Sequence, residues 1–461
     1  MAQTTGESLE AAITRAGSPV ELMRNQSRRA FSHGFGFVPS EFTNWRSEAA
    51  AWHESCVLMD QSHHMVDLFI KGPDTVKLLS EIGVNSFATF GNDKAKQFVA
   101  VNNDGLYIGD CVLVGLSDTS AELIGRRTAL DWVEYNAGIG GYDVELERDP
   151  QSVERGGRPP KLYRYEVQGP NTGPLFEKLT GAPIPDVKFF GMTAFTIAGK
   201  LVRAIRHGMA GQVGFEIFGP WDEGEAVRDA ILAGGEEFGI TRVGSLAYST
   251  ANLESGWIPG PMPAIYSGDD LAAYREWLPA SAAGSLAGSL NSGDVSDYYV
   301  TPYDLGYGRH IKFDHDFIGR DALQELSKRP QRRKVTLVWD AKDAAGIFES
   351  LWTPGPTLKY FSLPKARYGQ FQMDEVLGAD GRAGISMDCG YVVRHQAVVS
   401  LAVVDESVAE PGTEVRVLWG ENPISDKPGV EQHVQGEIRA TVASAPLDDF
   451  ARTQYRSAAL V

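Results

Sequence analysis

The chain has 461 residues, of which 43% are hydrophobic and 22% are charged, and its formal net charge is −17. This length exceeds that of one compact core and predicts about two to four domains. The acidic balance argues against nucleic acid or an anionic membrane as the main partner, because both repel a negatively charged protein.

The cysteines and the first residues bear on where the protein works. Cys56, Cys111 and Cys389 are far apart and lack metal-ligand spacing, so we expect reduced thiols and no metal site. The opening residues lack the basic and apolar regions of a signal peptide, and no apolar run approaches the ~18 residues that span a bilayer. We therefore expect a soluble, cytoplasmic protein, either a monomer or a homodimer.

The first hundred residues combine an aromatic loop with a strand and a helix. Residues 31–45 carry several aromatic rings between glycine and proline breaks. This suits either the lining of a pocket for a flat ligand or a packed N-terminal arm. Residues 65–70 are a predicted strand and residues 73–82 an amphipathic helix. His63 and His64 precede the strand, and a hydrogen-bonding role is favoured because no third metal ligand stands at a useful spacing.

The next segment predicts a hairpin and a strand-to-helix junction. Residues 94–101 and 107–114 are predicted strands joined by the turn N-N-D-G. A further strand over residues 121–124 is followed by a helix over residues 128–136. Arg126 lies at this junction, where a guanidinium can fork onto a carboxylate near a helix N-terminus. The alternative is an ordinary solvated arginine.

A pattern of strand, Gly-Pro turn and helix occurs twice. It is found in D-L-F-I-K-G-P-D-T-V-K-L-L and again about a hundred residues later in Y-E-V-Q-G-P-N-T-G-P-L-F-E-K-L. The repetition predicts two related α/β units. Farther on, Glu216 interrupts the apolar strand F-E-I-F. It is either the outward residue of an alternating strand or an acceptor for the N–H groups of a ligand.

Residues 245–255 predict one short helix, closed by Gly256. Leu246 and Leu253 share one face of it, and Tyr248 points the opposite way over small or polar residues. Tyr248 is therefore either a core tyrosine or a hydroxyl beside open space. The Ala/Gly/Ser-rich tract at 280–293 is typical of a mobile insertion or lid. From residue 333 onward, alternating strands predict an all-β domain.

Several of these segments together resemble the glycine-cleavage T-protein (aminomethyltransferase) superfamily, and they occur in family order across nearly the whole chain. The matching pieces include M-D-Q-S-H-H-M-V-D-L-F-I-K-G, V-N-N-D-G-L-Y-I-G-D, H-G-M-A-G-Q-V-G-F-E-I, L-E-S-G-W and L-G-Y-G-R-H-I-K-F-D-H-D-F-I-G-R-D-A-L. Within the superfamily the chain is similar to the tetrahydrofolate-dependent aryl O-demethylases of vanillate and syringate. That closer similarity is carried by E-F-T-N-W, R-H-G-M-A-G and A-Y-R-E-W-L-P.

The resemblance implies an α+β fold with three domains around a central channel. Residues 1–60 with 150–330 would form a folate-binding α/β domain, and residues 61–149 a second, related α/β domain that contributes the aromatic substrate site. Residues 331–461 would form a β-barrel or jelly roll. Tetrahydrofolate would sit in the channel, with Glu216 accepting hydrogen bonds from the pterin while Gln168 and Trp257 help to hold it.

The implied reaction moves a methyl group from an aryl ether oxygen to N5 of tetrahydrofolate. Tyr248 is the candidate general acid, because the ordinary pKa of a tyrosine roughly matches that of a phenolic leaving group. Arg126 is the candidate clamp for the substrate carboxylate. The other candidate substrate contacts are Gln61, Ser62, His64, His33 and Phe31. The reaction requires neither a metal nor a corrinoid.

One departure from the family pattern bears on the choice of chemistry. The T-protein pattern has two adjacent acids at the end of the N-N-D-G hairpin, where this chain has Gly109 and Asp110. Aminomethyl chemistry is therefore disfavoured, and the role of Asp110 is open. The alternatives are a one-carbon transferase that handles amines and a folate-binding scaffold without catalysis.

Overall fold

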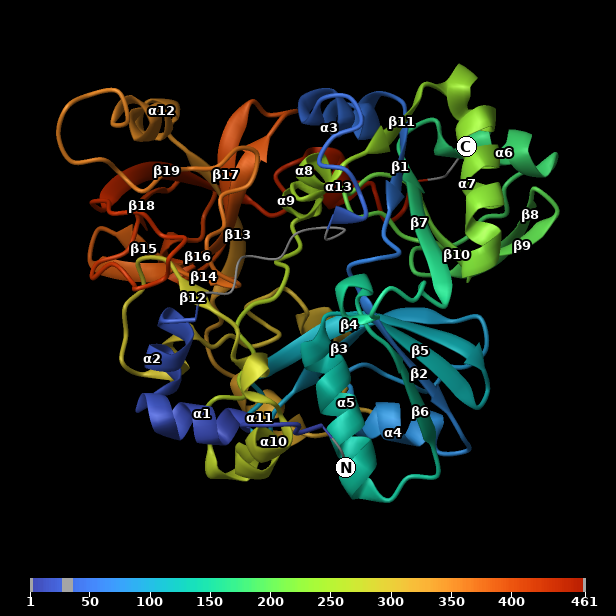
Figure 1. Cartoon of the computed structure of the whole chain (residues 1–461), viewed down its shortest axis with the longest axis horizontal. Coiled ribbons are helices and arrows are strands. Elements are labelled where there is room, and N and C mark those ends of the chain that lie inside the picture. Colours follow the sequence, from blue (N-terminus) through green and yellow to red (C-terminus); the bar gives the residue numbers. More distant parts are fainter. Residues whose placement is uncertain (1–2, 27–35, 459–461) are drawn as a thin grey trace.

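The computed structural model describes residues 3–26 and 36–458, and its strands form three main sheet units (Figure 1). Two units are open sheets and the third is a closed barrel. The barrel and the first sheet occupy the two upper corners of Figure 1, and the second sheet lies below the first. Over the described residues, no helix has the length and apolar character needed to cross a membrane.

The first sheet has six strands in the order β11-β1-β7-β10-β9-β8. These are β1 (Cys56–Asp60), β7 (Leu162–Gln168), β8 (Met192–Ile197), β9 (Lys200–Arg206), β10 (Gly214–Pro220) and β11 (Ile240–Val243). On one face, Tyr163, Val167 and Phe215 pack under α6 (Thr172–Thr180) and α7 (Gly224–Gly235). Because side chains alternate along a strand, the even-numbered residues of β7 and β10 face the interior of the molecule.

The second sheet is antiparallel, with the order β3-β4-β5-β2-β6. Its strands are β2 (Val66–Lys71), β3 (Ala95–Val101), β4 (Tyr107–Ser117), β5 (Ser120–Gly125) and β6 (Glu145–Asp149). The helices α4 (Thr75–Ile82) and α5 (Arg127–Gly140) supply buried residues to the same core. The predicted hairpin and strand-to-helix junction are confirmed, with element ends that extend a few residues farther.

The predicted first domain includes two segments that pack with the second sheet. The helices α1 (Leu9–Ala16) and α2 (Pro19–Arg24) share the core of the second sheet, not of the first. The same holds for α10 (Ala272–Trp277) and α11 (Arg320–Leu326). Their apolar faces are buried there, beside Tyr107 and Trp132. The helix α3 (Trp45–Glu54) and the helices between β7 and β11 pack around the first sheet.

The third unit is a closed barrel in the order β13-β17-β16-β15-β18-β19. The alternating strands predicted an all-β domain here, and the family resemblance implied a barrel or jelly roll. The barrel strands are β13 (Arg333–Trp339), β15 (Asp374–Gly378), β16 (Gly381–Val392), β17 (Ala397–Val404), β18 (Glu414–Trp419) and β19 (Gly436–Ser444). The helix α12 (Ala341–Glu349) packs against it. The last helix, α13 (Asp449–Thr453), leaves the barrel, and Tyr455 Oη donates to Gly208 O near the first sheet at 2.9 Å. The all-β assignment therefore fails for this final segment.

The predicted repeat is confirmed at its two Gly-Pro turns. Gly72 follows β2 with φ +151°, and Gly169 follows β7 with φ +125°, both in the region that favours glycine. In each turn the amide three residues later donates to the glycine carbonyl, at 3.2 Å from Thr75 and 3.0 Å from Thr172. Each turn then opens a helix, so the same chain reversal is built once in each open sheet.

The tract at 280–293 is packed into the molecule, and the expectation of a mobile lid is wrong. Leu286 and Ala287 have no exposed surface, and they form β12 (Leu286–Ala287), which pairs with β14 (Phe371–Gln372). Gly288 is so close to Met373 O that a Cβ would collide with that carbonyl. The small side chains here permit close packing of backbones, which composition alone does not distinguish from a flexible linker.

The predicted helix over residues 245–255 is divided into α8 (Ser245–Tyr248) and α9 (Ala251–Ser255). At the division, Ser249 Oγ donates to Leu246 O at 2.6 Å, and Thr250 Oγ1 donates to Ala247 O at 2.9 Å. Such hydroxyls compete with helical hydrogen bonds and bend the backbone. The break leaves Tyr248 at the end of α8.

Candidate active site

A cavity of about 760 Å³ lies among the three sheet units. Both open sheets and the barrel contribute to its walls. Its lining residues include Gln61, His64, Gln97, Tyr107, Asp110, Arg126, His207, Glu216, Tyr248, Asn252, Trp257, Tyr307, Lys365, Arg367 and Lys427. Since no single unit encloses it, the cavity corresponds to the channel that the family resemblance implied.

Most of the predicted site residues meet in this cavity. Those that line it are Tyr248, Arg126, Gln61, His64, Glu216 and Trp257. Gln168 does not line it: it is fully buried, and its Oε1 accepts from Ala210 N at 3.2 Å behind the wall. Ser62 is also set back, and its hydroxyl bonds both backbone groups of Arg164. Phe31 and His33 lie outside the described residues.

Tyr248 is almost fully buried and borders the cavity at the end of α8. Its Oη lies 3.3 Å from His64 Nε2, with the two rings in an edge-to-face arrangement. Burial, and then the carboxylates of Glu166 and Glu216, raise the pKa of Tyr248 well above its usual value. The phenol therefore keeps its proton across the physiological pH range and stands beside a group that can exchange protons with it.

Arg126 is the N-cap residue of α5 and borders the cavity. Gly260 lies so close that a Cβ at that position would collide with the guanidinium. Burial, and then the positive charge of Arg367, lower the pKa of Arg126 to about 10. Arg126 is thus still a cation at neutral pH. A second cation nearby makes this part of the cavity suited to an anion.

Asp110 is the hydrogen-bonding centre of one wall, a role that sequence reasoning had left open. It accepts from Trp257 Nε1 at 3.0 Å and from Tyr307 Oη at 2.8 Å. Tyr107 and Gln97 also donate to it. The indole N–H of Trp257 is therefore already used by the protein, so Trp257 can offer a ligand only its ring surface.

The barrel supplies a charged part of the wall that sequence reasoning missed. Lys365 Nζ donates to Asp388 Oδ2 at 2.6 Å and to Asn252 Oδ1 at 2.9 Å. Asn252 Nδ2 donates to the same Asp388 oxygen at 2.6 Å. Asn252 follows Tyr248 by four residues, so this network ties the helical segment of the site to the barrel. No local pattern could have indicated it, because Asn252 lies more than a hundred residues from both Lys365 and Asp388 in the sequence.

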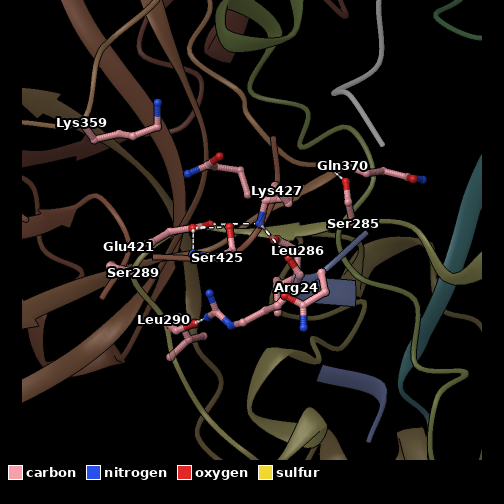
Figure 2. Close-up of polar contacts among 12 residues, drawn as sticks. Arg24, Ser285, Leu286, Ser289, Leu290, Lys359, Gln370, Glu421, Ser425 and Lys427 are labelled. Carbon is pink, nitrogen blue, oxygen red and sulfur yellow. Dashed lines mark hydrogen bonds and ion pairs between the residues drawn. The ribbon is translucent and has the colours of Figure 1, made fainter. Parts of the chain in front are cut away.

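Lys427 joins three distant parts of the chain at the edge of the cavity (Figure 2). Its Nζ donates to Leu286 O at 2.7 Å, Arg24 O at 3.1 Å and Glu421 Oε1 at 3.2 Å. Glu421 also accepts from the backbone and the hydroxyl of Ser425. The barrel loop, the tract at 280–293 and the end of α2 are thereby held together around a buried ion pair.

Comparison with known proteins assigns the family. The family model described as GCVT N-terminal domain matches residues 23–259. The chain therefore belongs to the glycine-cleavage T-protein family. A solved structure, the glycine cleavage system aminomethyltransferase T from Bartonella henselae, shares the fold with a TM-score of 0.60. It is 18% identical and covers 94% of this chain, with 97% of its own chain matched.

Two curated relatives point to particular members of the family. A syringate O-demethylase from Sphingobium sp. (strain NBRC 103272 / SYK-6) is 41% identical over 97% of this chain and 98% of its own length. A sesamin methylene transferase from Sinomonas sp. (strain No.22) is 28% identical over 92% of this chain and 94% of its own. Both similarities extend over nearly the whole chain, barrel included.

Proposed function

We propose that the protein is a tetrahydrofolate-dependent aryl O-demethylase that acts on methoxybenzoates of the syringate and vanillate type. The proposal rests on one observation: a buried phenol (Tyr248), an arginine (Arg126) and an acid (Glu216) line the same cavity. The near full-length similarity to a syringate O-demethylase supports the same substrate class. The substrates would be aromatic acids derived from lignin, and the protein would work in the reducing cytoplasm.

The cavity has room and polarity for a folate. Its volume of about 760 Å³ lies within the range of cofactor sites. Glu216 Oε1 accepts from Arg164, whereas Oε2 has no donor among the residues described in the structure. A carboxylate oxygen at the cavity wall suits the N–H groups of a pterin. When bound, tetrahydrofolate supplies N5 as the methyl acceptor.

Arg126 would bind the carboxylate of the aromatic acid through its planar fork. Arg367, whose charge acts on Arg126, adds to the attraction. Gln61 and His64, which also line the cavity, would contact the oxygens of the ring. Holding the methyl carbon in line between the ether oxygen and the acceptor can itself supply ~7–11 kcal/mol of the rate enhancement.

Tyr248 would donate its proton to the ether oxygen as the oxygen–methyl bond breaks. Because its pKa is raised, the phenol releases the proton only as negative charge builds on the departing oxygen. The bonding electron pair stays on that oxygen, which leaves as a phenol. His64, whose Nε2 lies 3.3 Å from Tyr248 Oη, can return a proton to the tyrosine.

The test is product analysis. Purified protein is incubated with tetrahydrofolate and a panel containing syringate, vanillate and related methoxybenzoates. The expected result is equal amounts of 5-methyltetrahydrofolate and demethylated phenol. Turnover of sarcosine or dimethylglycine alone would favour the amine-handling alternative. Folate binding with no turnover of any substrate would favour a scaffold.

A further inference from the structure

Arg164 connects the two open sheets through a pair of buried carboxylates. It lies on β7, and its Nη1 donates to Glu216 Oε1 at 2.8 Å. Its Nη2 donates to Glu122 Oε1, on β5 of the other sheet, at 2.7 Å. All three side chains are at most 3% exposed. The guanidinium is therefore fixed from both sides, and solvent does not screen either contact.

This region holds more acids than bases. Glu166 lies directly across from Glu216 in the pairing of β7 with β10, and Asp67 acts electrostatically on Glu122. Burial raises the pKa of Glu122 to about 8 and that of Asp67 to about 6, while Arg164 opposes both shifts. Burial, and then Glu216, raise the pKa of Glu166 well above its usual value. Two acids so close do not readily ionise together, and Arg164 is bonded to the one that faces the cavity.

We propose that Arg164, held in place by Glu122, is a positioning residue that holds one oxygen of the Glu216 carboxylate and so turns its Oε2 toward the bound pterin. The inference rests on the proposed role of Glu216 in folate binding. One oxygen of the carboxylate is committed to Arg164 and the other is left for the ligand, which fixes the orientation of the acceptor. A buried cluster of acids is costly unless each is paired, so this arrangement is better explained by ligand binding than by stability.

Two other residues, His207 and Tyr248, lie close enough to Glu216 for its charge to affect their pKa values. His207 lines the cavity, and burial lowers its pKa while Glu216 opposes that shift. Tyr248 stays protonated for the reason given above. Neither therefore brings a positive charge near Glu216 at neutral pH. Arg164 is left as the cation that donates to it among the described residues.

The test compares folate affinity in three variants of the full-length protein. Arg164→Met should weaken tetrahydrofolate binding by about tenfold or more at pH 7, because the Glu216 carboxylate is then no longer held in the orientation that presents Oε2 to the pterin. Arg164→Lys should bind tetrahydrofolate with an affinity between that of the wild type and that of Arg164→Met, because an ammonium keeps the charge without the fork. Calorimetry at pH 7 gives the dissociation constants.

Arg155→Met is the matched control. Arg155 is equally buried and donates to Asp149 Oδ1 at 2.8 Å, but neither residue lines the cavity. It should lose stability without losing folate affinity. Equal affinity losses in the two methionine variants would overturn the inference. If Arg164→Met does not fold, wild-type affinity in Arg164→Lys would do so.

The result of this affinity test can be distinguished from the result of the demethylation test. A wild-type protein that binds tetrahydrofolate but demethylates no methoxybenzoate would refute the demethylase and leave the role of Arg164 to be decided by the affinities. A wild-type protein that demethylates these substrates, with Arg164→Met binding folate normally, would refute the positioning role alone.

Discussion

At the scale of single residues, the protonation states of Tyr248 and Arg126 are set by burial and by the charged groups around them in the cavity. Tyr248 is kept protonated by burial and by two carboxylates, with His64 within hydrogen-bonding distance. Arg126 is kept cationic although burial and Arg367 lower its pKa to about 10. A neutral donor and a fixed cation are the states that protonation of an ether and capture of a carboxylate require.

Tyr248→Phe should lower kcat on syringate or vanillate by ~10²–10⁴, because it removes the proton donor and keeps the ring. Substrate and folate affinities should change far less, since the interaction is strongest in the transition state. Steady-state kinetics with both substrates varied gives these parameters. Tyr163→Phe is the control: the Tyr163 hydroxyl is buried with no partner among the described residues, so kcat should be unchanged. Near-normal kcat in Tyr248→Phe would mean that the tyrosine is a packing residue.

Arg126→Lys should raise KM for the aromatic acid by about tenfold or more, because an ammonium cannot bind both oxygens of a carboxylate in the same plane. Folate affinity should hardly change. The neighbouring Arg127, which lies 3.6 Å from Asp131 and does not line the cavity, gives the control Arg127→Lys. A larger effect at position 127 than at 126 would show that the anchor is misassigned.

At the scale of secondary-structure elements, the repeated strand–turn–helix unit depends on two glycines. Each turn reverses the chain against backbone of a neighbouring segment. At Gly169, a Cβ would lie 2.6 Å from Ser55 O, and at Gly72 it would collide with Asp143 O. At both positions the positive φ and the nearby carbonyl oxygen exclude any residue that has a Cβ.

Gly169→Ala should therefore lower the free energy of unfolding by about 2–4 kcal/mol, through backbone strain and the displacement of β1. Gly181→Ala is the control, because Gly181 has φ +68° but open space around the position of a Cβ. It should cost only about 1 kcal/mol. Urea unfolding measures both, and equal losses would show that contact with Ser55 does not matter.

At the scale of the whole molecule, the cavity exists because three units meet. The Lys427–Glu421 pair is one of the contacts that hold them, since its hydrogen bonds reach α2 and the tract at 280–293 (Figure 2). The network of Lys365, Asp388 and Asn252 ties α9 to the barrel in a similar way. The shape of the site thus depends on contacts between residues distant in the chain.

Lys427→Met should destabilise the protein by about 3–5 kcal/mol, because it leaves the Glu421 carboxylate buried without its cation. The double variant Lys427→Met with Glu421→Gln should recover part of that loss, since no buried charge remains. Urea unfolding of the two single variants and the double variant measures the coupling. Strictly additive losses would show that the two side chains do not stabilise each other.

Local patterns were enough to predict much of the fold. Hydrophobic alternation, the N-N-D-G turn and the Gly-Pro repeats correctly predicted strands beyond residue 333, the hairpin and the two related strand–turn–helix units, because these signals act over a few residues. The pattern around Tyr248, the junction at Arg126 and the acid at Glu216 also singled out residues that line one cavity. The roles assigned to them are still predictions.

The partners of these residues were decided only by the tertiary structure. Arg164 reaches Glu216 across 52 positions and Glu122 across 42, and no periodicity relates residues so far apart. The same is true of Trp257 and Tyr307, which donate to Asp110, and of the cations that the barrel contributes to the cavity wall. The tract at 280–293 was mistaken for a lid because small residues serve both flexible loops and close-packed backbones. The packing between units distinguishes a flexible loop from a closely packed segment, and composition does not.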